Sequence, residues 1–151
     1  AQALMEAAGD DGDFDALCQQ LHRYQATLRT CFTLENFDNL IKNGRMRPIV
    51  GTLLRSLGIH IIADATAEGT IHVADKARGV GKTYRAITAL MKASKDCTDA
   101  EVVISHCENL EGAMALKRQI LADLPVKQVD LLSCRGLTSF YAMEKGLIVG
   151  Y

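Results

Sequence analysis

The chain has 151 residues, of which 48% are hydrophobic and 23% are charged, and its net charge is −1. These values are typical of a globular domain of average size, and they exclude an intrinsically disordered chain. No apolar run reaches the roughly 20 residues that a membrane-spanning helix needs, and the balanced charge gives no reason to expect a nucleic acid partner.

The five cysteines are spread along the chain without a C-x-x-C pair. This pattern is typical of reduced thiols, so we expect a cytoplasmic protein. The chain opens on a helix-like run without an initiator Met. We therefore expect it to be a fragment of a longer protein.

Residues 1–44 are predicted to form three helices and one strand. Residues 3–8 are expected to be the end of the first helix. Asp13 is expected to cap the second helix, because its carboxylate can accept hydrogen bonds from the N–H groups of the first turn. A strand follows at 28–34, and Asn36 is expected to cap a short helix that ends at Gly44 in a left-handed conformation. We expect residues 1–44 to be a helical lead-in or the end of a preceding domain, and 45–151 to form a separate α/β domain.

An elbow of Asn43, Gly44 and Arg45 separates the two predicted parts, and Pro48 suits the first turn of the next helix. Four cations and no acid lie between residues 39 and 63. The guanidinium of Arg45 can present paired N–H groups to a carboxylate or a phosphate. An exposed loop arginine without a ligand is at least as common, and the apolar stripes beside it are compatible with either a core or a lipid pocket.

Two strands at 59–65 and 70–76 are expected to pair as an antiparallel hairpin. Whether Asp64 lies across from His72, where the two could form a surface pair, depends on the register. Downstream, strands at 101–107, 128–134 and 147–151 alternate with helices, which predicts right-handed parallel crossovers. Thr138 or Ser139 is expected to cap the last short helix, which ends at Gly146. The predicted fold class is therefore α/β, with a mixed sheet of about six strands and helices packed on it.

A Gly-punctuated loop, RGVGK, is predicted after the hairpin. It lacks the P-loop pattern because Lys76 stands where the first glycine is needed. Between residues 76 and 95 there are six cations and no acid. A solvated helix face is the commoner explanation, and the alternative is a docking patch for an acidic partner that includes Lys76, Arg78, Lys82 and Arg85.

No residue pattern predicts an enzyme. The four histidines lack the recurring spacing of a zinc site, and there is no G-x-S-x-G motif. We therefore expect no catalytic residue, no metal and no cofactor.

Residues 31–46, CFTLENFDNLIKNGRM, resemble a segment of the DegV-like fatty-acid-binding proteins that usually ends in Gly-Arg-Ile. Residues 59–62, IHII, follow at the family's spacing, where it tends to have Ile-Lys-Pro-Ile. An Arg-Gly pair, Arg78 and Gly79, comes after the hairpin. The order and spacing of these segments, rather than any single motif, extend the resemblance over essentially the whole chain.

The resemblance implies the fold of a DegV C-terminal domain and the binding of one long-chain fatty acid, as a ligand, between two domains. It also implies presentation of this lipid to the catalytic subunit of a bacterial fatty acid kinase, without catalysis by the binding protein itself. It places Arg45 near the fatty-acid carboxylate.

Two departures from the family bear on the site. The N-terminal domain, with its Ser/Thr residues at the carboxylate, is expected to be missing from this chain. The family also often ends in a His-Thr-Gly-Pro-Gly-like stretch, and counting back from Gly146 puts Ser139 near that His, with Thr138 and Tyr141 beside it. Either a hydroxyl replaces the imidazole or the ligand differs. The alternative function is a protein-interaction module of the same fold that has lost lipid binding.

Overall fold

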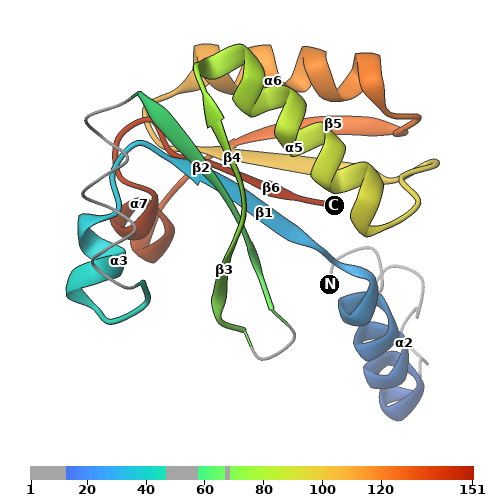
Figure 1. Ribbon diagram of the computed structural model, residues 1–151. Helices are drawn as coiled ribbons and strands as arrows, with labels where there is room; N and C mark the ends of the chain where they lie inside the picture. Colours follow the sequence, from blue (N-terminus) through green and yellow to red (C-terminus); the bar gives the residue numbers. More distant parts are fainter. Residues whose placement is uncertain (1–12, 47–57, 67–68) are drawn as a thin grey trace.

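The computed structural model describes residues 13–46, 58–66 and 69–151. In this part, six strands form one mixed sheet in the order β3-β2-β1-β6-β4-β5, and helices lie on both faces (Figure 1). The strands are β1 (Thr30–Leu34), β2 (Ile59–Ala65), β3 (Ile71–Arg78), β4 (Glu101–His106), β5 (Gln128–Ser133) and β6 (Leu147–Gly150). The helices are α2 (Phe14–Thr27), α3 (Asp38–Lys42), α5 (Val80–Ser94), α6 (Leu110–Asp123) and α7 (Gly136–Ala142). The predicted α/β class and mixed sheet are confirmed.

Strand direction in the second half follows the prediction only in part. β4 and β5 are parallel and are joined through α6, as the alternation of strands and helices predicted. β6 instead lies antiparallel between β1 and β4, so the expected series of parallel crossovers ends at β5.

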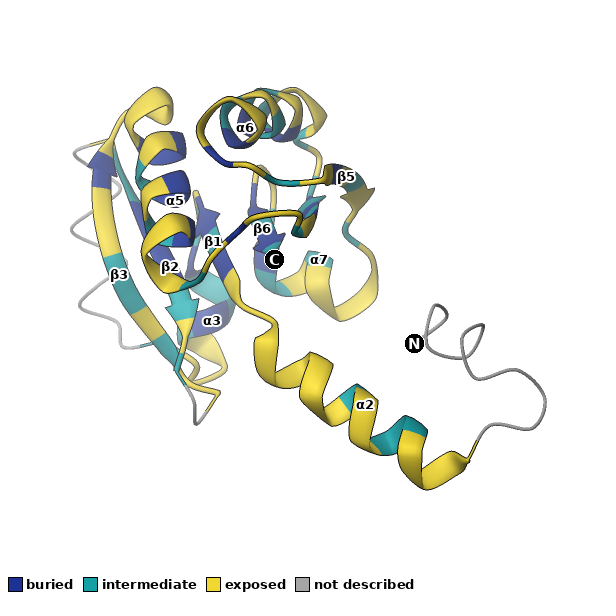
Figure 2. Cartoon of the chain, turned by 90° about the vertical axis from the view of Figure 1, so that its right-hand side faces the viewer, coloured by how far each residue is buried: buried dark blue, intermediate teal, exposed yellow. Residues whose placement is uncertain are grey.

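Helices α5 and α6 lie next to each other on one face of the sheet (Figures 1 and 2). Their buried residues recur every three or four positions, as on one side of a helix. On α5 these include Ile87 and Met91, and on α6 they include Leu116 and Ile120. They pack with the buried residues of β4 and β6 into the larger core cluster.

Helices α3 and α7 lie on the opposite face, over a second core cluster. β1 serves both clusters because successive side chains of a strand point to opposite faces. Cys31 belongs to the cluster under α5 and α6, whereas Phe32 and Leu34 belong to the cluster under α3 and α7. Leu40 of α3 and Ala142 of α7 complete that second core.

Helix α2 starts as predicted and extends away from the sheet (Figures 1 and 2). The Asp13 carboxylate accepts a hydrogen bond from the backbone N–H of Asp15 at 3.0 Å, which satisfies one free donor of the first turn. None of the residues of α2 is buried, and Phe14 is 75% exposed. This helix therefore contributes nothing to the two cores beneath the other helices.

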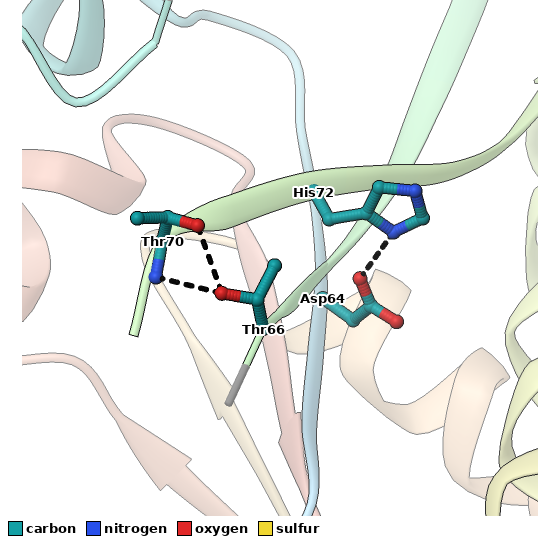
Figure 3. Close-up of polar contacts among 4 residues, drawn as sticks. All are labelled: Asp64, Thr66, Thr70 and His72. Atoms are coloured by element: carbon teal, nitrogen blue, oxygen red, sulfur yellow. Dashed lines mark hydrogen bonds and ion pairs between the residues drawn. The ribbon is translucent and has the colours of Figure 1, made fainter. Parts of the chain in front are cut away.

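The hairpin of β2 and β3 is antiparallel as predicted, and its register places Asp64 opposite His72 (Figure 3). His72 Nδ1 and Asp64 Oδ1 are 2.9 Å apart. Nearer the turn, the hydroxyl oxygens of Thr66 and Thr70 are 2.8 Å apart, and the Thr70 N–H donates to Thr66 Oγ1 at 3.2 Å. These contacts hold the two strands together close to the turn.

The expected boundary between residues 44 and 45 does not divide the sheet. β1 precedes it and β2 follows it, and the two strands pair from Cys31–Asp64 to Leu34–Ile61. Leu34 and Ile61 also share a core cluster. The described residues on the two sides of this boundary therefore belong to one sheet. The helices predicted at 3–8 and from Pro48 onward lie outside the described residues.

The last helix begins earlier than predicted. α7 starts at Gly136 with Arg135 at its N-cap position, and no side chain caps it. Thr138 and Ser139 lie inside the helix, so the prediction that one of them caps it is wrong. Gly136 has a φ of +52°, a conformation that glycine adopts readily, and the chain turns into the helix at that point.

Candidate functional site

An apolar cavity of about 260 Å³ lies between the sheet and the helices α3 and α7. Its walls come from the second core cluster, which the described elements cover only partly. Most of the lining is aliphatic or aromatic, and two lining side chains carry polar groups, Arg45 and Tyr141. The apolar lining includes Phe32, Leu34, Leu40, Ile71, Ala142 and Ile148.

Arg45 reaches this cavity because the end of α3 fixes its backbone. The N–H of Arg45 donates to the carbonyl of Leu40 at 2.8 Å, and the N–H of Gly44 donates to the carbonyl of Ile41 at 3.0 Å. These two bonds form a Schellman motif, in which the residue after the C-cap takes a left-handed conformation. Gly44 is that residue, with a φ of +67°. The predicted elbow is thus a helix end that delivers a guanidinium to the cavity.

Contacts with the ring of Phe140 and between the helices α7 and α3 position Tyr141. Its ring meets that of Phe140 edge to face, with centroids 5.1 Å apart. The side-chain amide of Asn39 in α3 donates to the backbone carbonyl of Phe140 at 2.7 Å. This bond joins α3 to α7, so the helices that carry Arg45 and Tyr141 are linked directly.

The structure does not bring all the predicted ligand residues to this cavity. Arg45 and Tyr141 both line it, whereas Thr138 and Ser139 do not. Thr138 is exposed and Ser139 is half-buried on α7. The residue of α7 that lines the cavity next to Tyr141 is Ala142, which the sequence analysis did not single out.

The chemistry of this cavity suits an amphiphile with an anionic end. An aliphatic chain gains free energy by leaving water for apolar walls, at about 0.8 kcal/mol for each buried methylene group. A guanidinium binds a carboxylate or phosphate by charge-assisted hydrogen bonds, and a phenol can add one more donor.

A second cavity of about 260 Å³ lies on the opposite face, near the N-termini of α5 and α6. It is more polar, since Glu35, Glu111 and Lys145 line it together with Tyr84. Burial raises the pKa of Tyr84, and the charges of Glu111 and Glu35 raise it further. Thr33 also lines this cavity, and its buried hydroxyl has no hydrogen-bond partner among the described residues. The mixed charges of this second cavity favour no ligand class, so we favour the apolar cavity as the functional site.

The four predicted docking residues lie on two sides of the edge strand β3. Lys82 and Arg85 are exposed on α5. Ala77 packs in the core cluster beneath α5, so its neighbours Lys76 and Arg78 point to the opposite face of the sheet. The predicted RGVGK loop is not present as such, because β3 ends at Arg78 and α5 begins at Val80.

The basic run of α5 also has an acidic neighbour on α6. Thr88 of α5 donates a hydrogen bond to Asp123 Oδ2 of α6 at 2.7 Å, and this bond is the main reason why the pKa of Asp123 is lowered. Arg85 and Lys92 contribute to the same lowering through their charge. The cations of α5 are therefore partly balanced by an acid that is distant in the sequence.

The described residues contain no group of three or more side chains that could hold a metal ion. Burial raises the pKa of Cys31 to about 12, and it also raises the pKa values of Cys97 and Cys134. The buried thiols of Cys31 and Cys97 stay protonated at neutral pH, so they are poor nucleophiles. Within the same residues, no helix is both long and apolar enough to cross a membrane.

Comparison with known proteins gives a consistent result. The model of a family described as DegV, an uncharacterised protein family, matches residues 1–147. A DegV domain-containing protein of Streptococcus gordonii is 31% identical over 151 residues, which is 99% of this chain and 53% of the relative. The chain thus spans about half the length of the curated relatives it matches.

Two solved structures with the same fold are loaded with fatty acids. One is the B3 protein of the Streptococcus pneumoniae fatty acid kinase loaded with linoleic acid, at a TM-score of 0.87 and 30% identity. That match covers 99% of this chain and 53% of the other. Another is a DegV family protein of Eubacterium eligens loaded with heptadecanoic acid, at a TM-score of 0.88 and 25% identity. It covers 99% of this chain and 54% of that protein.

Proposed function

The chain belongs to the DegV family, and from that membership we propose that its apolar cavity binds part of a long-chain fatty acid. The observation that carries the proposal is the placement of Arg45 and Tyr141 on the wall of an otherwise apolar cavity. The acyl chain would contact the aliphatic lining, and the carboxylate would accept hydrogen bonds from the guanidinium of Arg45.

The volume of the cavity supports a partial site. At about 260 Å³ it is slightly smaller than the about 300–1,000 Å³ that is usual for ligand pockets. The rest of the lipid would contact residues outside the described part or residues of a longer protein.

We also propose that the bound lipid is presented to a fatty acid kinase, and that this chain performs no chemical step itself. The relative from Streptococcus pneumoniae is described as part of such a kinase and holds a fatty acid. The poor nucleophilicity of the buried thiols Cys31 and Cys97 agrees with a binding role.

The alternative function is a protein-interaction module that has lost lipid binding. The exposed basic residues of β3 and α5 favour it, because patches of one charge sign steer association with acidic partners. Mass spectrometry of the purified chain under native conditions distinguishes the two functions. A co-purified fatty acid supports the lipid carrier, whereas a chain that neither retains nor takes up fatty acid supports the module.

Replacement of Arg45 tests the site directly. We expect Arg45→Ala to weaken the binding of a fluorescent fatty acid about ten- to hundred-fold, because one charge-assisted contact is worth about 1.5–3 kcal/mol. The affinity of Arg45→Lys should fall between those of the unchanged chain and Arg45→Ala, since an ammonium keeps the charge but loses the paired N–H groups. Arg118→Ala is the matched control, because Arg118 is exposed on α6, which covers the opposite face. Equal affinity of Arg45→Ala and the unchanged chain would remove Arg45 from the site.

A further inference from the structure

Two cysteines stand next to each other at the ends of the parallel strands β4 and β5. The register of these strands runs from Glu101–Gln128 to His106–Ser133, and Cys107 and Cys134 are the residues that directly follow this last pair. The ladder continues to this point, because the N–H of Cys134 donates to the carbonyl of His106 at 2.8 Å.

The two thiols also point to the same face of the sheet. Paired residues of neighbouring strands share a face, and both cysteines pack against the core cluster under α3 and α7. Neighbouring strands lie about 4.8 Å apart, which is within the about 4.4–6.8 Å Cα separation at which disulfides form. Burial raises the pKa of Cys134, and the charge of the nearby Cys107 raises it further.

Both residues of this cysteine pair are partly exposed to solvent. Cys107 and Cys134 are half-buried, whereas Cys31 and Cys97 are buried. A disulfide in a protein with otherwise reduced thiols is usually transient and redox-sensing. We propose that Cys107 and Cys134 form a reversible disulfide when the protein meets a hydroperoxide, and that this bond regulates the cavity beside α7.

The reaction is a two-electron oxidation of the thiol pair. The Cys107 thiolate attacks one oxygen of the hydroperoxide, the O–O bond breaks, and the alkoxide or hydroxide that leaves takes up a proton. Cys134 then attacks the sulfur of the Cys107 sulfenic acid, the S–O bond breaks, and the Cys134 proton leaves with the hydroxide as water. Burial and the charge of Cys107 raise the pKa of Cys134, so Cys134 enters this second step as a protonated thiol.

The disulfide would act on the cavity through α7. Cys134 directly precedes Arg135, the N-cap residue of α7, and Tyr141 and Ala142 of this helix line the cavity. A bond to the end of β4 fixes the start of the helix and restricts its movement. This regulatory role rests on the proposed function, since it requires a lipid to enter and leave the cavity.

Peptide mapping tests the bond without any reference to lipid. The purified chain is treated with hydrogen peroxide, denatured, alkylated and digested. We expect the peptides that contain Cys107 and Cys134 to be cross-linked, and dithiothreitol to separate them. Recovery of both cysteines as alkylated thiols, or a bond to Cys18 instead, would overturn the proposal.

Variants separate the two steps of the reaction. Cys134→Ser should stop at a sulfenic acid on Cys107, which dimedone traps, whereas Cys97→Ser should form the disulfide normally. Phenylarsine oxide, which bridges two close thiols, provides a measurement without an oxidant. It should bind the reduced chain and Cys97→Ser but not Cys134→Ser. Equal binding by all three would show that the pair is not the site.

The effect on the cavity is measured by the exchange of a fluorescent fatty acid. We expect the oxidised chain to release the lipid severalfold more slowly than the reduced chain, and Cys134→Ser to show no change with peroxide. A mapped disulfide with unchanged release would overturn the regulatory role. If the reduced chain binds no fatty acid although the disulfide forms, the proposed function fails and the redox pair remains.

Discussion

The buried hydroxyl of Tyr151 and the buried thiol of Cys31 make the free energy of unfolding depend on pH in the alkaline range. Burial raises the pKa of Tyr151 from 10.0 to about 12, although a hydrogen bond with Ser94 opposes this shift. Burial likewise raises the pKa of Cys31 from 9.0 to about 12. Because the folded state holds these protons more tightly than the unfolded state, their contribution is complete below pH 9 and is lost as the pH rises to 12.

We therefore expect the free energy of unfolding in urea to fall between pH 9 and pH 12. Tyr151→Phe should reduce the fall above pH 10 by up to about 2 kcal/mol, because phenylalanine has no proton to lose. Tyr24→Phe is the control, since Tyr24 is 52% exposed. An identical pH dependence in Tyr151→Phe and the unchanged chain would contradict this assignment.

At the residue scale, the sequence predicted best where a local rule decides the geometry. Asp13, Gly44 and the Asp64–His72 pair behave as expected because each depends on a cap, a helix end or a strand register. The cap of α7 was not predictable in the same way. Several polar residues stand near its start, and Gly136, with its φ of +52°, decides where the helix begins.

At the scale of elements, the connection between α7 and β6 depends on Gly146. A Cβ atom added there would lie 2.9 Å from the backbone carbon of Ala142, which is closer than real Cβ contacts allow. The backbone of α7 cannot yield as the end of a flexible side chain could. Gly146 therefore lets β6 leave the helix at close range.

We expect Gly146→Ala to destabilise the protein by about 1–3 kcal/mol, in line with overpacking elsewhere. Gly150→Ala, at the far end of β6, is the matched control, because an added Cβ there meets no atom within 4 Å. Thermal unfolding of both variants measures the difference. Equal midpoints would show that the α7 backbone adapts to the extra methyl group.

Element type was easier to predict than element order. The periodicity of apolar residues identified all six strands, because their alternation is encoded locally. The place of β6 between β1 and β4 depends on pairing partners that are distant in the sequence. The lining of the apolar cavity shows the same difference between local and long-range features. Arg45 and Tyr141 were predicted as ligand residues, whereas Ile148 of β6 was not.

At the scale of the whole molecule, the edge strand β3 separates two pairs of cations. Lys76 and Arg78 point to the face that holds the apolar cavity, and Lys82 and Arg85 lie on α5 over the other face. A kinase that acts on a bound fatty acid must approach the carboxylate. The pair on the cavity side is therefore better placed to guide docking.

We expect Lys76→Glu with Arg78→Glu to lower the association rate with the kinase about tenfold at low salt, since single-sign patches steer encounter. Lys82→Glu with Arg85→Glu carries the same change in charge on the other face and should have the smaller effect. Surface plasmon resonance over a range of salt concentrations compares the two. A larger effect of the α5 pair would place the docking surface on that helix.

The central position of β6 also sets the order in which the protein can fold. β6 is the last of the six strands in the sequence, yet it joins the antiparallel strands β1, β2 and β3 to the parallel pair β4 and β5. Before residues 147–150 leave the ribosome, β1 and β4 each present an open edge to other chains. The edges of β1 and β4 must therefore avoid pairing with other chains until the four residues of β6 join the two parts of the sheet.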